Sequence, residues 1–156
     1  MLNANRDHLR HSAETKKNAA NALMSGKSAH PVPAVYLCHV ALECALKLRI
    51  LVKNNATHVE DLKRFLQKED FESLFYGKSG HDLHHLERTA GLRRYLVASG
   101  RESLLEDGGW AKMGGARPYS LRYGVENVQA DEAAEQVRFA VKLTDIVLQG
   151  GVGVYV

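Results

Sequence analysis

Apolar residues recur along most of this chain at the three- and four-residue steps of an α-helix. The clearest case covers residues 34–53, where apolar side chains point in nearly every direction around the predicted helix. Most of its polar residues fall on one line, at four-residue steps: His39, Glu43 and Lys47, with Arg49 off the line. Such a narrow polar stripe is typical of a helix in the middle of a bundle or against a partner subunit.

Two further helical segments flank this one. Residues 3–24 carry apolar residues at helical spacing and stop before Gly26. The Pro31-Val32-Pro33 stretch then opens the next element, where proline is tolerated because the first N–H groups of a helix have no partner. Residues 59–76 predict one or two short amphipathic helices with these inward-facing residues: Leu62, Phe65, Leu66, Phe71, Leu74 and Phe75.

The second half of the chain is less regular. Residues 77–80 predict a turn, and a helix begins near His81 with Ser79 as its cap and Gly91 as its bend or end. Residues 100–130 predict a long loop that contains the glycine-rich stretch 108–115, with Trp110 as its anchor.

The last helix is predicted from about Glu132 to the glycine pair Gly150-Gly151. The tail, residues 152–156, alternates Val with Gly or Tyr and suits an extended arm at a dimer contact. The chain shows no internal repeat and no second domain, so we expect one all-α domain over residues 1–156.

Composition adds a class and a location. A hydrophobic fraction of 45% and a charged fraction of 25% are those of an ordinary globular protein. The N-terminal residues carry basic side chains with no apolar stretch behind them, and no uncharged run approaches the roughly 20 residues that span a bilayer. We therefore expect a cytoplasmic protein without a membrane segment.

The charge distribution permits a nucleic-acid partner without requiring one. The formal net charge is +3, and the excess of Lys and Arg lies in residues 1–59, where eight basic residues face only Asp7, Glu14 and Glu43. A basic front half is compatible with RNA or nucleotide binding, although a solvated helix face explains it equally well.

Cys38 and Cys44 are the two cysteines, and both lie on the predicted helix 34–53. Six helical positions separate them by about 9 Å along the axis, on different faces. A disulfide needs Cα atoms within roughly 7 Å, so we expect two small buried thiols rather than a bridge, a metal site or a nucleophile.

The cluster His81-Asp82-Leu83-His84-His85 is the first candidate for chemistry. Pairs of histidines at helical spacing can hold zinc, but a metal here would need ligands from elsewhere, such as Glu43 or Asp107. We therefore predict no metal and no cofactor. The chain also lacks a phosphate-binding loop, a serine elbow and a Cys/His pair with an orienting carboxylate.

Three stretches, taken in order, resemble a known family. They are Ala41-Leu42-Glu43-Cys44-Ala45-Leu46-Lys47, then Gly80-His81-Asp82-Leu83, then Leu121-Arg122-Tyr123 before the alanine-rich last helix. Together they resemble the HEPN domain (higher eukaryotes and prokaryotes nucleotide-binding) over residues 35–149. The resemblance implies an up-and-down bundle of four or five helices, usually dimeric.

Many HEPN proteins are metal-independent ribonucleases with an arginine followed, after four to six residues, by a histidine. The histidine can transfer protons and the arginine can stabilise the phosphate. Here the last histidine is His85, so no such pair follows Arg122. The stretch from Arg6 to His11 fits the spacing, but it lies on the first helix, where the family does not place it, and such a match is expected by chance.

The chain thus resembles the HEPN subset without the ribonuclease pair, whose members accompany a small nucleotidyltransferase or act in toxin–antitoxin systems. Our first hypothesis is a non-catalytic homodimer that binds a nucleotide, RNA or a partner protein of the nucleotidyltransferase type. A ribonuclease toxin and a purely structural helical module are the alternatives. The ligand- or partner-binding candidates are His81, Asp82, Arg122, Tyr123, Glu43 and Lys47.

Overall fold

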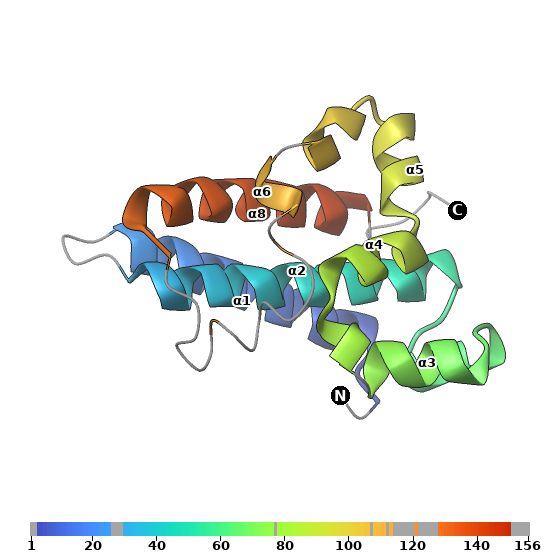
Figure 1. Ribbon diagram of the computed structural model, residues 1–156. Helices are drawn as coiled ribbons and strands as arrows, with labels where there is room; N and C mark the ends of the chain where they lie inside the picture. The colour runs from blue at the N-terminus through green and yellow to red at the C-terminus, as the bar shows by residue number, and fades with distance from the viewer. Residues whose placement is uncertain are drawn as a thin grey trace.

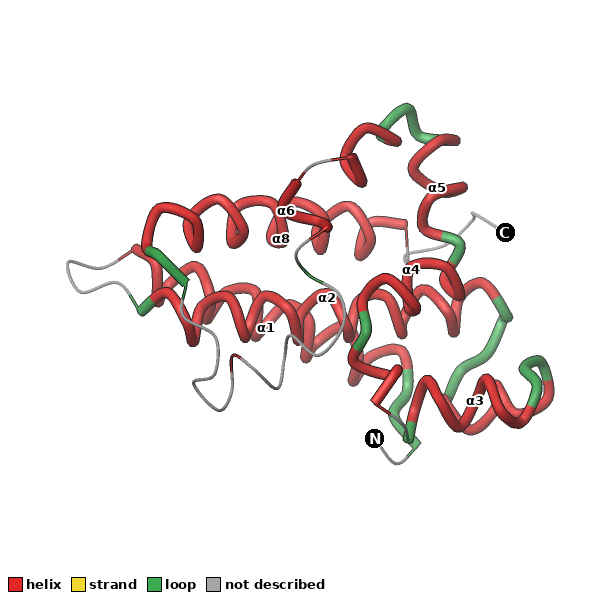
Figure 2. The backbone as a smooth tube through the Cα atoms, viewed as in Figure 1, coloured by secondary structure: helices red, strands yellow, loops and turns green. Residues whose placement is uncertain are grey.

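The computed structural model describes residues 3–25, 30–76, 78–106, 108–111, 113, 121 and 128–150. Every regular element in these ranges is a helix (Figure 2), and the β-type pairing that they contain is an isolated antiparallel bridge between Asn5 and His58. The all-α prediction is therefore confirmed for the described part of the chain. The predicted tail at 152–156 lies outside it.

Three long helices form the body of the molecule: α1 (Arg6–Ser25), α2 (Pro31–Lys53) and α8 (Ala130–Gly150). Both α1 and α8 pack along α2 (Figure 1). The first two helices run antiparallel, whereas α8 runs in the same direction as α2. The central position predicted for the helix at 34–53 is confirmed.

Shorter helices cover one end and one side of this body: α3 (Lys68–Phe75), α4 (Leu83–Ala90), α5 (Leu92–Ala98) and α6 (Gly108–Ala111). Three 3₁₀ helices connect them: Val59–Arg64, Lys78–His81 and Glu102–Glu106. The described residues thus contain seven α-helices, more than the four or five expected. The excess arises because residues 59–98 break repeatedly, at the 3₁₀ segments and at Gly91, which adopts a left-handed φ of 63°.

Local hydrogen bonds set where the helices begin. Asn5 Oδ1 accepts the backbone N–H of His8 at 2.9 Å, so α1 begins at Arg6, after the predicted start. Helix α2 begins three residues earlier than predicted, at Pro31, which occupies a position that needs no N–H. The cap of α4 is Asp82 rather than Ser79: its carboxylate accepts the N–H of His84 at 3.0 Å.

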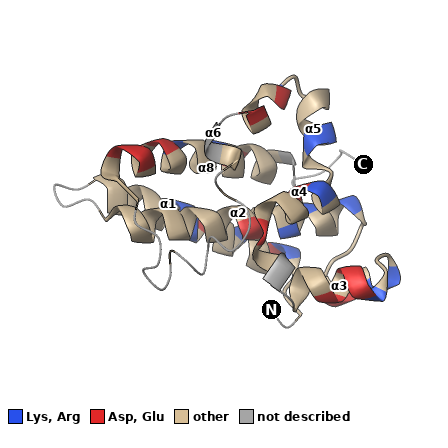
Figure 3. Cartoon of the chain, in the orientation of Figure 1, with Lys and Arg blue, Asp and Glu red and all other residues tan. Residues whose placement is uncertain are grey.

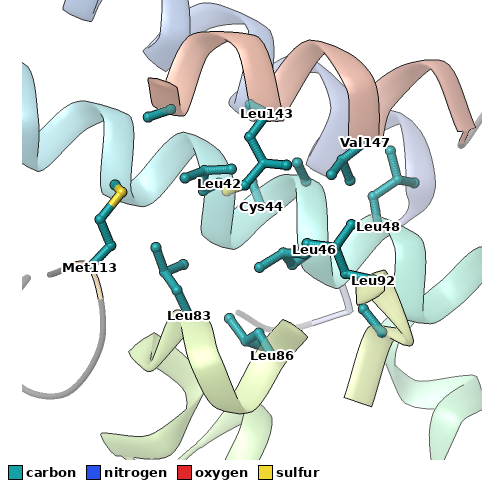
Figure 4. Close-up of a cluster of buried hydrophobic side chains, with 14 of the residues drawn as sticks. Leu42, Cys44, Leu46, Leu48, Leu83, Leu86, Leu92, Met113, Leu143 and Val147 are labelled. Atoms are coloured by element: carbon teal, nitrogen blue, oxygen red, sulfur yellow. The ribbon is translucent and has the colours of Figure 1, made fainter. Parts of the chain in front are cut away.

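The hydrophobic core surrounds the C-terminal two thirds of α2. All residues from 41 to 51 are buried. Figure 4 shows the side chains of Leu42 and Leu46 between those of Leu83 and Leu86 of α4 and the side chains of α8. A helix covered from this many directions cannot expose a polar face, so its polar residues must find partners inside the protein.

Two predictions for single aromatic residues had different outcomes. Trp110 is buried, as expected for an anchor. Phe65, predicted to face inward, is 56% exposed. The prediction of one or two short helices over 59–76 left open where a break would fall. The 3₁₀ helix ends at Arg64 and α3 starts at Lys68, so Phe65 lies in the break between them and its side chain need not face inward.

The two cysteines are free and buried, as predicted. Burial raises the pKa of the Cys38 thiol to about 12, and burial is also the main reason that the pKa of Cys44 is raised. Neither thiol ionises at neutral pH, so neither is an activated nucleophile.

None of the helices in the described ranges is both long and apolar enough to cross a membrane.

The central role of α2 predicts a large asymmetry between two substitutions. Leu46 is fully buried, and Leu46→Ala should lower the free energy of unfolding by about 2–5 kcal/mol because it leaves a cavity. Phe65→Ala removes more atoms from an exposed position and should change it by less than about 0.5 kcal/mol. Chemical denaturation of both variants measures the difference, and equal effects would contradict the described packing.

Candidate functional site

The polar stripe of α2 is enclosed by the fold. His39 is fully buried, and the Lys47 side chain is only 3% exposed. Lys47 Nζ donates a hydrogen bond to Glu43 Oε1 at 2.6 Å, one helical turn back, and lies 5.7 Å from the centre of the Phe75 ring. The ammonium is thus neutralised by a carboxylate and contacts an aromatic face, two ways of stabilising a cation away from water.

His81 completes this cluster from another part of the chain. Its Nδ1 lies 3.0 Å from Glu43 Oε2, so the two carboxylate oxygens hold two different partners. The buried His39 Nε2 donates to the backbone carbonyl of His81 at 2.9 Å. The stripe of α2 therefore fixes His81 twice, by its main chain and by its ring, while the His81 side chain remains 41% exposed.

The charge state of Glu43 follows from these partners. Burial has the largest influence and would by itself raise the pKa of Glu43. The hydrogen bond from His81 and the adjacent Lys47 ammonium outweigh burial and hold the pKa of Glu43 below its ordinary value of 4.5. Glu43 is therefore ionised at neutral pH. Because an ionised carboxylate only accepts hydrogen bonds, His81 Nδ1 carries a hydrogen and donates it to Glu43.

Gly80 explains how the chain brings His81 to α2. A Cβ atom at this position would overlap the backbone carbonyl oxygen of Leu74, so no larger residue fits without a shift. The close approach lets the 3₁₀ turn Lys78–His81 fold tightly against the end of α3. Asp82 then starts α4 immediately after His81. In the Gly80-His81-Asp82 sequence, the glycine thus permits a close backbone contact, the histidine pairs with the buried Glu43 carboxylate, and the aspartate caps α4.

The other histidines of this segment do not converge with His81. His84 Nε2 donates to the backbone carbonyl of Trp110 at 2.8 Å, and the two rings lie 5.0 Å apart. His85 belongs to the same helix, and its Nε2 is buried. Among the residues that the structure describes, no three His, Cys, Asp or Glu side chains are grouped as metal ligands, and Asp107 lies outside them.

The two weak catalytic candidates lie far along the chain from this cluster, on α1. The Arg6 guanidinium donates its Nε–H to the Ala56 carbonyl at 2.7 Å, which fastens the start of α1 to the chain after α2. His11 is exposed. Five helical positions place the two side chains about 140° apart around the helix axis. Within one chain this geometry does not bring them together.

Arg122 and Tyr123, the remaining predicted site residues, lie outside the described residues, as does most of the glycine-rich stretch 108–115. Of the predicted set, the structure thus brings together Glu43, Lys47 and His81, with Asp82 next to them.

Sequence reasoning identified the His39–Glu43–Lys47 stripe but not its function as the support of His81. The signal was available: three polar residues at four-residue steps on an otherwise apolar helix need an internal partner if the helix is central. The contact of Phe75 with Lys47 and that of Trp110 with His84 were missed, because nothing in local spacing indicates contacts across 28 and 26 positions.

No family model matches the chain. No curated protein and no solved structure matches it either. The HEPN resemblance therefore stays a prediction from the three sequence stretches.

The buried ion pair predicts non-additive effects of substitution. Lys47→Met leaves the Glu43 carboxylate buried without its ammonium and should lower the free energy of unfolding by about 3–5 kcal/mol. The double variant Glu43→Leu/Lys47→Met removes both charges and should recover most of that loss. Lys63→Met, which breaks the exposed pair with Glu60, is the control and should cost less than about 1 kcal/mol. Equal losses in the single and double variants would contradict the pairing.

The lowered pKa of Glu43 predicts how stability responds to acid. Its ionised form is favoured in the folded state, so its stabilising effect is complete above pH 4.5 and decreases as the pH falls through the lower folded-state pKa. Below pH 4.5 the unfolding free energy of the wild type should therefore fall relative to that of Glu43→Leu/Lys47→Met, which lacks the carboxylate. Denaturant titrations over a pH series measure this. A gain in the stability of the wild type relative to the double variant below pH 4.5 would contradict it.

Proposed function

We propose that this chain is a HEPN-like helical domain that binds a nucleotide or RNA and does not cleave it. The observation that carries the proposal is the exposed imidazole of His81, held in place by the buried Glu43–Lys47 pair. Two buried charged residues thus hold one surface side chain in a fixed position.

The energetic argument is that the pair is not the best way to stabilise a core. Two apolar residues of similar volume are often as stabilising as a buried ion pair, or more so. A cost of this kind is expected where a polar group must be positioned for binding. Since Lys47 is too deep to contact a ligand, its role is to neutralise Glu43, whose role is to orient His81.

A phosphate group is a suitable ligand for this surface. Phosphate oxygens accept hydrogen bonds. Because the Nδ1–H of His81 already donates to Glu43, His81 can donate to a phosphate through Nε2 when both ring nitrogens carry hydrogen. The basic excess of residues 1–59 favours the approach of such an anion. Asp82 limits the site on one side, because its carboxylate, which accepts the His84 N–H as the cap of α4, is a negative charge that disfavours an anion there.

The sequence and the geometry of α1 support the part of the proposal that excludes cleavage. No arginine–histidine pair of the ribonuclease type follows Arg122, and Arg6 and His11 diverge around α1. The proposal also includes what the resemblance implies: a dimeric HEPN bundle in the cytoplasm, with Arg122 and Tyr123 as further binding residues and a nucleotidyltransferase-type protein as a partner.

Binding and cleavage should be measured on the same preparations. We expect wild-type protein to bind ATP or a short RNA, and His81→Ala to weaken binding about tenfold or more, since a hydrogen bond to a charged group contributes roughly 1.5–3 kcal/mol. His11→Ala, which replaces an exposed histidine elsewhere, is the matched control and should bind normally. The Glu43→Leu/Lys47→Met variant should stay folded but bind as weakly as His81→Ala.

Two results would overturn the proposal. Metal-free RNA cleavage that His11→Ala abolishes would establish the ribonuclease alternative instead. Undetectable binding of all nucleotides and RNAs would favour a structural module whose ligand is another protein.

A further inference from the structure

A second polar site lies at the opposite end of α2 from its first residue, beside the elbow between α4 and α5. A pocket of about 420 Å³ opens there. Its walls contain the cations Arg49, Lys53 and Arg94, the ring of Tyr95 and small residues of α4 and α5. Figure 3 shows basic segments on α2, α4 and α5 gathered at this end of the molecule.

Arg49 is the most informative of these residues. It lies on α2 off the polar stripe, and it is only 8% exposed. Its guanidinium carbon lies 4.1 Å from the centre of the Tyr95 ring. Its Nε is buried without a hydrogen-bond acceptor, and no carboxylate pairs with it in the described part of the chain. Burial also lowers the pKa of Arg49.

The other two cations extend this positive surface toward solvent. Lys53 Nζ donates to the Thr89 carbonyl at 3.2 Å and lies against Gly91, where a Cβ would be 3.5 Å from the ammonium nitrogen. Arg94 is exposed at the mouth of the pocket. No acidic side chain of the described residues lines the pocket, so three cations face the same space without an anion.

A second groove shows that this charge pattern is not general on the surface. Between α1 and α8 lies a space of about 350 Å³ that also contains two cations. There Lys17 pairs with Asp145 at 2.6 Å, and Arg10 contacts Glu14 and donates to the Leu148 carbonyl. Those cations already have internal partners, whereas no carboxylate among the described residues pairs with the cations that line the elbow pocket.

We propose that the pocket at the α4–α5 elbow binds a phosphate or pyrophosphate group through Arg49, Arg94 and Lys53. A guanidinium matches the geometry of phosphate oxygens with paired N–H donors, and stacking on Tyr95 holds the Arg49 guanidinium in one plane. The volume lies within the range of small-ligand sites. This inference uses none of the residues of the His81 cluster and does not depend on the function proposed for it.

Inorganic pyrophosphate is the first probe, measured by calorimetry with the full chain. We expect a dissociation constant below about 1 mM that weakens as salt is added. Arg94→Ala should weaken binding about tenfold or more, because it removes an exposed cation from the pocket without disturbing the core. Arg88→Ala, the matched control, removes an exposed arginine of α4 that does not line the pocket and should bind as the wild type does.

Further arms identify the source of the phosphate. Tighter binding of ADP than of AMP or pyrophosphate would assign a free nucleotide, and tighter binding of RNA with a 5′-phosphate than without one would assign an RNA end. Arg49→Lys keeps the charge but loses the paired donors, and it should bind pyrophosphate more weakly while remaining folded.

The outcomes separate this site from the His81 surface. His81→Ala should leave pyrophosphate binding unchanged. If ATP and RNA binding prove insensitive to His81→Ala while pyrophosphate still binds and is weakened by Arg94→Ala, the His81 proposal fails and the pocket proposal stands. The pocket proposal is overturned if the wild type does not bind pyrophosphate or ADP, or if Arg88→Ala weakens binding as much as Arg94→Ala does.

Discussion

The enclosure of α2 is the constraint on which the rest of this structure depends. Because residues 41–51 are buried from all sides, the charges of Glu43 and Lys47 cannot reach water and must neutralise each other. The carboxylate retains one oxygen for a further donor, and His81 supplies it. The positions of the 3₁₀ turn at Lys78–His81 and of α4 follow from that contact and from the hydrogen bond between His39 and the His81 carbonyl. One buried pair thus links the central helix to the surface.

The two candidate sites use the same helix in different ways. At the stripe, cation and anion are both internal, and what reaches the surface is a histidine with a fixed orientation. Toward the C-terminal end of α2, Arg49 is buried with no carboxylate of the described residues paired to it, and it contacts the face of Tyr95. The first arrangement is complete within the protein, whereas the second has a deficit of negative charge that a ligand can supply. The two sites share no residue, and Lys47 and Arg49, two helical positions apart, lie on nearly opposite faces of α2, so each site can be tested by its own substitutions.

The sequence predicted the helices of this fold better than the connections between them. The long helices were evident because twenty or so residues of consistent periodicity determine a face. Residues 59–98 were harder to predict, because the 3₁₀ helix is capped at Phe65 and Gly91 adopts a left-handed conformation. After each break, a different set of positions faces inward. Ser79 and Asp82 were both acceptable caps by residue type. Only the 3₁₀ turn decides between them.

The candidate site was predictable in its parts and not in its assembly. Glu43, Lys47 and His81 were named from the sequence, but 38 positions separate Glu43 from His81, and no local rule joins them. The close approach at Gly80 that permits the contact depends on the position of the Leu74 carbonyl, a property of the folded backbone. The sequence contains one signal for the pocket at Arg49, namely that this residue lies off the stripe.

The order of the long helices also has a consequence for synthesis of the chain. Helices α1 and α2 are neighbours in sequence and can pair early, but α8, which covers another face of α2, begins only at Ala130. At about 5–20 residues per second, the ribosome needs roughly 4–15 s to add the intervening residues. During that interval the apolar surface that α8 will cover is open to other chains. The central helix is therefore also the segment most exposed to misassembly, and most suited to a chaperone, before the last helix arrives.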